Sequence, residues 1–362
     1  MNGSRILIEQ AFNGIRLERI PIFDLFCNDE VIEYFAGVKL GGADDEMVVT
    51  MAAGSALDGT RSISVPSHDR STWIDRAGNT RISDRWTSWL KKSAYQDVED
   101  WAGWLEEYIE KYQASSGMSI VQLDLTEAKP TEERRKSVVT KQRMYNDLLN
   151  GTVNIYCTPS TAINALLYYM GLEIVSYLWA CYRELLLRWI DLYRQATINY
   201  IEIAANHQIS PVAMIYSDIA YNNGLMFSNS MLNDLGFFEE VEQICHTCHK
   251  KGLKVIFHSD GYFMSLLDDL IVTGIDGLNP IEKAAGMDIY EIRSKYPDLT
   301  LVGGVDVTHL LRLAKPEEIR IETRKIINET GTEGHLLLGS STEVGSDIPL
   351  ENYLAFHSEV LK

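Results

Sequence analysis

Short runs of β-branched and apolar residues alternate with longer amphipathic stretches along the C-terminal half of the chain. Each run is followed by a turn and then by residues with helical periodicity. The runs predict strands at 212–217, 254–258, 275–279, 299–303 and 335–339. The stretches predict helices within 228–251, 262–273, 286–296, 308–329 and 351–361. A long series of such strand–helix units predicts a parallel sheet.

A closed barrel fits this series better than an open sheet. No Gly-x-Gly-x-x-Gly or phosphate-loop sequence opens any of the predicted helices, and open nucleotide-binding sheets depend on such sequences. Barrels of alternating strand and helix often form one unit of about 250 residues or more. We therefore predict an α/β fold, a (β/α)8 barrel, built as a single domain over residues 1–362.

The N-terminal half has a less regular pattern. Strands are expected at 18–23, 62–66, 119–125, 153–157 and 200–204. The segment 72–112 is rich in tryptophan and charge, and we expect it to form a hairpin and a helix over the barrel mouth. An unusually apolar helix between Pro159 and Gly171 could support a lid or the face of a homodimer.

The overall charge limits the partners of this protein. Asp and Glu number 51 against 33 Lys and Arg, which gives a net charge of -18. Such a surface repels nucleic acid and anionic membranes, and favours a small or neutral substrate. The five cysteines are too sparse for a disulfide scaffold. Because no signal sequence or membrane span is evident either, we expect a cytoplasmic protein.

Polar residues follow several of the predicted strands at their C-terminal ends. In an eight-fold barrel these ends meet at one mouth, where the reactive groups of barrel enzymes lie. Five acidic or imidazole side chains are therefore expected to converge: Asp218, His258, Asp260, Glu282 and Asp306.

The sequence His258-Ser259-Asp260-Gly261 is the most distinctive of these strand ends. A histidine at the end of a strand, with an acid two residues later, is typical of a metal half-site or an acid/base pair. Alternatively, His258 only orders its loop by binding a neighbouring carboxylate. Asp218 and Asp306 could bind substrate or metal, or could cap the helices that follow them.

Other strand ends add candidates for substrate binding. Asn279 and Glu282 flank Pro280, which fixes a turn that would direct both side chains to the pocket. The hydroxyl-rich loop 339–343 offers Ser341 as a donor and Glu343 as a further ligand. The expected catalytic residues are thus His258, Asp260 and Asp218. The expected substrate-binding residues are Asp306, Asn279, Glu282 and Ser341, and the expected metal ligands are His258, Asp260 and Glu343.

The sequence Cys245-His246-Thr247-Cys248-His249 has the spacing of covalent haem attachment. It lies inside a predicted amphipathic helix, in a chain without an export signal, and no second cysteine pair stands at zinc-site spacing. We therefore expect two cysteines on the buried face of a helix with exposed histidines.

The run from Asp218 to Asn352 resembles the uroporphyrinogen decarboxylase superfamily. The resemblance rests on SDIAYNNGLMFSNSML, on HSDG with the LLDDLIVTGIDGLNPIE that follows, on GGVDV and on IPLEN, in that order. It implies a (β/α)8 barrel that is either a decarboxylase or a corrinoid- or thiol-dependent methyltransferase.

Departures from the family pattern separate these branches. Uroporphyrinogen decarboxylases carry an arginine-rich motif after the first strand, whereas this stretch reads PIFDLFCNDEV, and its acids Asp24, Asp29 and Glu30 would repel a substrate with many carboxylates. In the methyltransferases, His-x-Cys and a later Cys hold zinc. Here Asp260 replaces the first Cys, and Ser341, Thr342 or Glu343 stands near the second. The resemblance therefore implies a harder site of histidine and carboxylates, or no metal.

From the resemblance we expect a corrinoid-dependent methyltransferase that acts on a small substrate. Methylcobalamin on a carrier protein would be the co-substrate, and zinc or another divalent metal the cofactor. Two alternatives remain open: a decarboxylase of a porphyrinogen-like substrate, and a non-catalytic protein that binds a tetrapyrrole or corrinoid.

Overall fold

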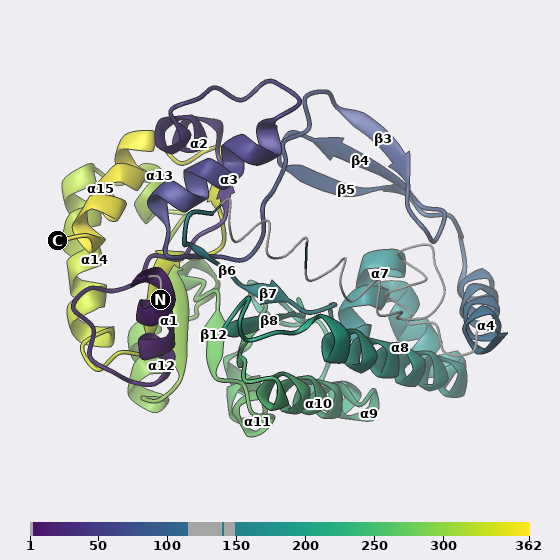
Figure 1. Ribbon diagram of the computed structural model, residues 1–362. Helices are drawn as coiled ribbons and strands as arrows, with labels where there is room; N and C mark the ends of the chain where they lie inside the picture. The colour runs from purple at the N-terminus through teal and green to yellow at the C-terminus, as the bar shows by residue number, and fades with distance from the viewer. Residues whose placement is uncertain (1–2, 115–139, 141–148) are drawn as a thin grey trace.

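A parallel sheet forms the centre of the molecule in the computed structural model, which describes residues 3–114, 140 and 149–362. Six strands follow one another side by side in chain order (Figure 1). They are β7 (Tyr156–Cys157), β8 (Val212–Tyr216), β11 (Lys254–His258), β12 (Gly277–Asn279), β13 (Thr300–Val305) and β14 (Leu336–Ser340).

The N-terminal segment closes this sheet into a barrel. Ile22 bridges Leu338 of β14, and Phe23 bridges Gly59 of β2 (Gly59–Thr60) in the same parallel sense. Strand β2 pairs in turn with β6 (Val153–Asn154), which leads directly into β7. The six strands, the segment at Ile22 and β2 make eight positions around a closed ring. The predicted (β/α)8 barrel is therefore confirmed.

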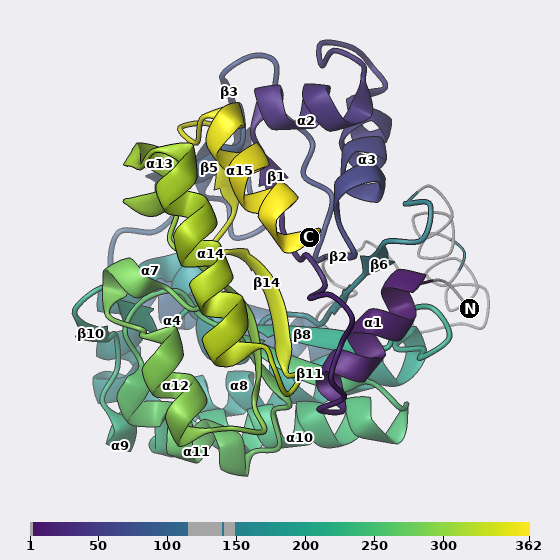
Figure 2. The same ribbon diagram turned by 90° about the vertical axis from the view of Figure 1, so that its left-hand side faces the viewer.

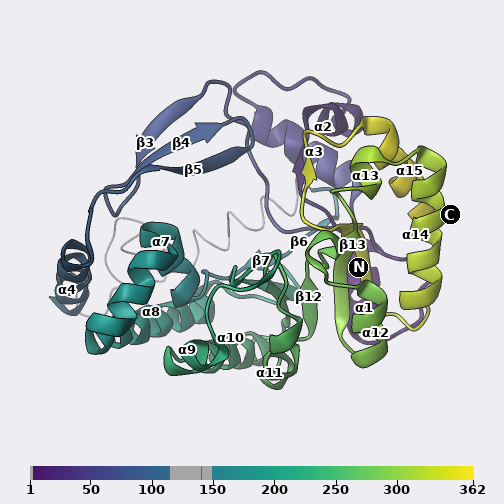
Figure 3. The same cartoon turned by 180° about the vertical axis from the view of Figure 1, so that it is seen from behind.

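Helices surround the ring on its outer side (Figures 2 and 3). The longer ones are α7 (Ala162–Cys181), α8 (Arg183–Ala204), α10 (Phe237–Lys250), α14 (Pro316–Thr330) and α15 (Leu350–Val360). Shorter helices complete the layer: α2 (Asp29–Ala36), α3 (Asp45–Ala56), α9 (Asn229–Asp234), α11 (Leu267–Val272), α12 (Ile289–Lys295) and α13 (Leu310–Leu313). Among the described residues, no helix is long and apolar enough to cross a membrane.

Two hydrophobic clusters show which strand residues face inward. One cluster joins α1 (Gly3–Phe12) to the barrel interior, with Ile8, Phe12, Val212, Met214 and Ile256 among its members. The alternate residues of the same strands belong to the other cluster, which packs against the helices. Since side chains alternate along a strand, the residues two positions after Met214 and Ile256 also face inward. These are Tyr216 and His258, at the C-terminal end of the barrel.

An antiparallel sheet and a helix interrupt the barrel between β2 and β6. The sheet contains β3 (Ser71–Ile74), β4 (Thr80–Asp84) and β5 (Thr87–Lys92), and α4 (Val98–Ala114) follows it. Arg85 binds Asp29 on α2 at 2.6 Å, and the Arg81 guanidinium stacks 3.5 Å from the ring of Tyr168 on α7. These contacts attach the sheet to α2 and to α7, and Figure 1 shows the sheet on the side of the molecule away from α10 and α11. The excursion predicted for 72–112 is confirmed, with one more strand than expected.

Three of the predicted strands have a different outcome. The prediction for 200–204 is wrong, because these residues end α8, where Ala196, Thr197, Ile201 and Ala204 are buried at helical spacing. The residues 62–66 form no strand, since the second barrel strand is β2, two residues earlier. The strand predicted at 119–125 lies outside the described residues.

Small paired segments and the cysteine pair complete the fold. Strand β1 (Phe26–Cys27) pairs with β15 (Val344–Gly345), and β9 (Ala220–Tyr221) pairs with β10 (Gly224–Leu225).

Cys245 and Cys248 are buried and free on α10. Burial raises the pKa of both thiols, that of Cys248 to about 12. The motif is therefore part of an ordinary amphipathic helix, as predicted.

Candidate active site

Strand register places His258 at the centre of the candidate site. In the pairing of β8 with β11, His258 stands beside Tyr216, and in the pairing of β11 with β12 it stands beside Asn279. Its ring centroid lies 4.7 Å from that of Tyr216. The imidazole is buried, with 3% of its surface exposed.

Asn279 determines which nitrogen of His258 carries the proton. The Asn279 Nδ2 donates to the Val302 carbonyl at 3.0 Å, so its Oδ1 accepts, and the His258 Nδ1 lies 2.6 Å from that oxygen. The Nδ1 must therefore be the protonated nitrogen, because an amide oxygen cannot donate. The lone pair of His258 is then on Nε2, which lies 3.9 Å from the Asp218 Oδ1.

The environment keeps this imidazole neutral. Burial, together with the charge of Arg61, lowers the pKa of His258 to about 3, although the bond with Asn279 acts in the opposite direction. A neutral imidazole with a free Nε2 lone pair is the form that binds metals.

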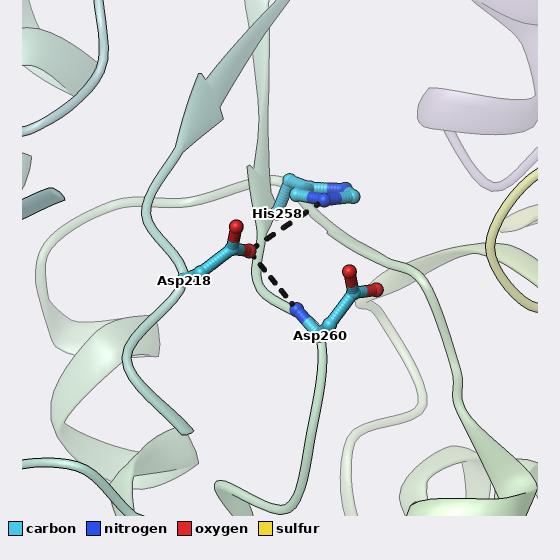
Figure 4. A group of neighbouring side chains, drawn as sticks. All are labelled: Asp218, His258 and Asp260. Atoms are coloured by element: carbon cyan, nitrogen blue, oxygen red, sulfur yellow. Dashed lines mark hydrogen bonds and ion pairs between the residues drawn. The ribbon is translucent and has the colours of Figure 1, made fainter. Parts of the chain in front are cut away.

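The register between β8 and β11 also places Asp218 next to Asp260. Each follows its strand by two residues, so the pairing of Tyr216 with His258 brings the two aspartates side by side. The Asp260 backbone N–H donates to the Asp218 Oδ1 at 3.3 Å. Figure 4 shows both carboxyl groups beside the imidazole. The three possible ligand atoms all lie within 4.8 Å of one another, and within the described ranges no other group of three has this geometry.

Burial and neighbouring charge raise the proton affinity of the two carboxyl groups. Burial is the largest cause that raises the pKa of Asp260 to about 7, and the charges of Asp218 and Glu282 add to it. Loss of water contact also raises the pKa of Asp218, although 48% of its side chain is exposed. The Asp260 Oδ1 is buried without a hydrogen-bond partner among the described residues. The site thus has unused acceptor capacity.

A divalent cation fits these donor atoms. Two ligands of a tetrahedral zinc ion lie about 3.4 Å apart. The His258 Nε2 and the Asp218 Oδ1 are 3.9 Å apart, so a small rotation of the half-exposed Asp218 side chain would bring both atoms to one ion. The unpartnered Asp260 oxygen would supply a third ligand. One imidazole and two carboxylates form a harder ligand set than the thiolate-rich sites of zinc proteins.

The loop after β11 is fixed by Gly261 and Glu282. Gly261 has φ +87°, and a Cβ there would lie 2.7 Å from the Ala220 carbonyl oxygen. Its N–H donates to the Glu282 Oε2 at 2.8 Å. Glu282 therefore orders the loop that carries Asp260, in addition to its charge effect on that residue.

The remaining predicted residues make local contacts. Asp306 accepts hydrogen bonds from the Thr308 and His309 N–H groups of its own loop, just before α13 begins at Leu310. The Ser341 hydroxyl accepts from the Val307 N–H. Glu343 is outside the group of three and pairs instead with Arg61, at 3.6 Å. Asp218 thus takes the place beside His258 and Asp260 that was predicted for Glu343.

Arg61 is the main residue of the site that the sequence did not reveal. It follows β2, and its side chain is only 8% exposed. The Arg61 Nη1 donates to the Tyr216 hydroxyl, and the Cys157 thiol donates to the Arg61 carbonyl oxygen. Placing the strand at 62–66 put Arg61 before its strand instead of after it. The correct register would have shown it at the mouth.

The first strand also differs from expectation at Asp24. This carboxyl group is 1% exposed and accepts hydrogen bonds from the N–H and hydroxyl of Ser340 and from the Tyr353 hydroxyl. Burial raises its pKa to about 7. Asp24 therefore ties the first strand to β14, and it does not meet a substrate as the repulsion argument assumed.

Comparisons with known proteins agree with this architecture. A family model described as uroporphyrinogen decarboxylase (URO-D) matches residues 122–362, well over half of the chain. Among solved structures, the fold is similar to that of a methyltransferase from Methanosarcina mazei, with a TM-score of 0.69 and 14% identity. That similarity covers 99% of this chain and 98% of the other. No curated protein sequence matches the chain.

Proposed function

Because this chain belongs to the uroporphyrinogen decarboxylase family, we propose that it is a methyltransferase that exchanges a methyl group between a small substrate and a corrinoid on a carrier protein. The structural similarity to the Methanosarcina mazei methyltransferase supports this branch of the family. The site of reaction would be the mouth of the barrel, at His258, Asp218 and Asp260.

One observation carries the proposal: the protonation pattern that Asn279 imposes on His258. With Nδ1 donating to Asn279, the Nε2 lone pair faces the two carboxyl groups. Protein sites that lack metal seldom leave a buried carboxyl oxygen without a hydrogen-bond partner, as the Asp260 Oδ1 is among the described residues, because this costs about 1–3 kcal/mol. A zinc ion or another divalent metal held there would act as a Lewis acid on an oxygen atom of the substrate.

The protein groups have distinct roles in this scheme. Burial holds the pKa of His258 near 3, so the imidazole is neutral at pH 7 and has no acidic proton to donate. It therefore cannot be the general acid. Its role would be to ligate the metal. Asp218 and Asp260 would complete the ligand set and orient the substrate. Because a carboxylate-rich site prefers hard partners, a methyl group bound to oxygen suits it better than one bound to sulfur.

Metal content and methyl transfer test the proposal together. Protein purified without chelator should contain close to one divalent ion per chain, and His258→Ala should lose it. With reduced cobalamin and a methyl donor, methylcobalamin should form and be visible by absorbance. The donors to compare are methanol, methoxyacetate, dimethylamine and methanethiol.

His246→Ala is the matched control, because His246 is exposed on α10 and should keep full metal content and activity. Absence of methylcobalamin with all four donors, or metal content unchanged in His258→Ala, would count against the proposal.

A second candidate function is decarboxylation, and the buried Arg61 at the mouth favours it by offering a cation to an acidic substrate. Release of carbon dioxide from a porphyrinogen, without any dependence on added metal or corrinoid, would support this candidate instead.

A further inference from the structure

One edge of the Arg61 guanidinium has hydrogen-bond capacity that the described residues leave unused. Its Nη1 is bound to the Tyr216 hydroxyl. On the other edge, Nε is buried and has no hydrogen-bond partner within the described part of the chain. Nη2 has a single ion pair there, with the Glu343 Oε2 at 3.6 Å, which is beyond hydrogen-bond length. The Nε and Nη2 groups together form the fork that carboxylates bind with two parallel hydrogen bonds.

Burial makes this unused capacity costly. Arg61 is 8% exposed, so its charge has little contact with water. An arginine removed from water needs partners for its N–H groups, because an unpaired buried charge is destabilising. Glu343 supplies only part of that need, and 46% of its own side chain is exposed. A carboxylate from outside the chain would satisfy the fork better.

The position of Arg61 relates this edge to the reaction site. Tyr216 contacts Arg61 with its hydroxyl and His258 with its ring. The charge of Arg61 also acts on Asp218, Asp260 and His258. A single side chain thus separates the guanidinium from the imidazole, so one small molecule could reach both.

We propose that the Nε–Nη2 edge of Arg61 binds a carboxylate group of the substrate, which takes the place of Glu343. That the bound carboxylate belongs to a substrate rests on the proposed methyl transfer, but the binding of a carboxylate at Arg61 does not depend on it. It specifies the substrate class as a small monocarboxylate whose methyl-bearing group lies near His258. A carboxylate substrate differs from the neutral one expected from the sequence. That expectation rested on the net charge of -18 and did not include the local positive charge of Arg61.

Calorimetric titration of the full chain tests the inference with two probes of similar size. Methoxyacetate carries the carboxylate, and 2-methoxyethanol is neutral. The wild type should bind methoxyacetate about tenfold or more tightly than 2-methoxyethanol, as a charge-assisted fork predicts. Arg61→Gln should lose this preference. Arg61→Lys should retain part of it, because lysine keeps the charge but not the fork.

Glu343→Gln covers the case in which Arg61→Gln does not fold, which a thermal melt would reveal. Removing the competing carboxylate should tighten methoxyacetate binding several-fold without changing 2-methoxyethanol binding. The inference is overturned if the wild type shows no preference, if folded Arg61→Gln keeps it, or if Glu343→Gln leaves methoxyacetate binding unchanged or weaker.

The experiments distinguish failure of the carboxylate site from failure of the proposed methyl transfer. Arg61-dependent binding without formation of methylcobalamin would retain the carboxylate site and refute methyl transfer. Methyl transfer from methanol, with no preference for methoxyacetate, would do the opposite.

Discussion

Removing the amide of Asn279 should disturb metal binding more than any other change outside the ligands themselves. In Asn279→Ala, the His258 Nδ1 and the Val302 carbonyl both lose their partner, at 2.6 and 3.0 Å respectively. Both groups are buried. Nothing then fixes the proton on Nδ1, so the Nε2 lone pair is no longer guaranteed.

The magnitude follows from these two bonds. A buried polar group left without a partner costs about 1–3 kcal/mol, so the free energy of unfolding should fall by roughly 2–6 kcal/mol in the absence of metal. Loss of a residue that orients a metal-bound histidine weakens metal affinity by about 10–100-fold. The two effects are measured separately, by urea denaturation of the metal-free protein and by calorimetric titration with Zn²⁺ or Mn²⁺.

Asn352→Ala is the matched control. Asn352 is an equally buried asparagine on α15, and its Nδ2 donates to the carbonyls of Leu311 and Ala314 at 2.8 and 3.0 Å. This variant should lose comparable stability and keep wild-type metal affinity. If Asn279→Ala binds metal as tightly as Asn352→Ala does, the argument from the His258 tautomer is refuted.

Two further changes test the loop and a buried acid. Gly261→Ala should lower the free energy of unfolding by about 1–3 kcal/mol in denaturation experiments, because φ is +87° and the Cβ would meet the Ala220 carbonyl; Gly103→Ala, an open helical position, should not destabilise. Burial raises the pKa of Glu240 from 4.5 to about 8, so the folded state holds a proton there that the unfolded state releases. Its stabilising effect is complete below pH 4.5 and is lost as pH rises through 8. Glu240→Gln should flatten the fall in unfolding free energy over this range, and an unchanged slope would show that Glu240 is ionised at neutral pH.

The barrel could be predicted wherever a strand was long and followed by a distinctive turn. The run at 254–258 coincides with β11, because its apolar residues are buried on both faces and the loop after it needs Gly261. The segment 200–204 has equally many β-branched residues. It is nevertheless the end of α8, because the buried residues of that helix continue through it at helical spacing. Local composition was overridden there by tertiary packing.

The candidate site could be predicted in its residues but not in its pairings. The neighbouring positions of Asp218 and Asp260 follow from register between β8 and β11, which no single strand reveals. The same limitation concealed Arg61, since placing the strand at 62–66 instead of 59–60 moved it to the wrong end of its strand. Asp306 was correctly expected at a strand end, but its carboxylate accepts backbone N–H groups from its own loop.

The ring of strands is secured unevenly around its circumference. Strands β8 and β11 are paired at five positions, as are β13 and β14, whereas the segment at Ile22 has one paired residue with each neighbour, supplemented by the bonds of Asp24 to Ser340. Amide protons of β8 and β11 should thus exchange with solvent last, and those near Ile22 much earlier. Breathing of the barrel would then occur along this seam, while the imidazole and its two aspartates keep their spacing.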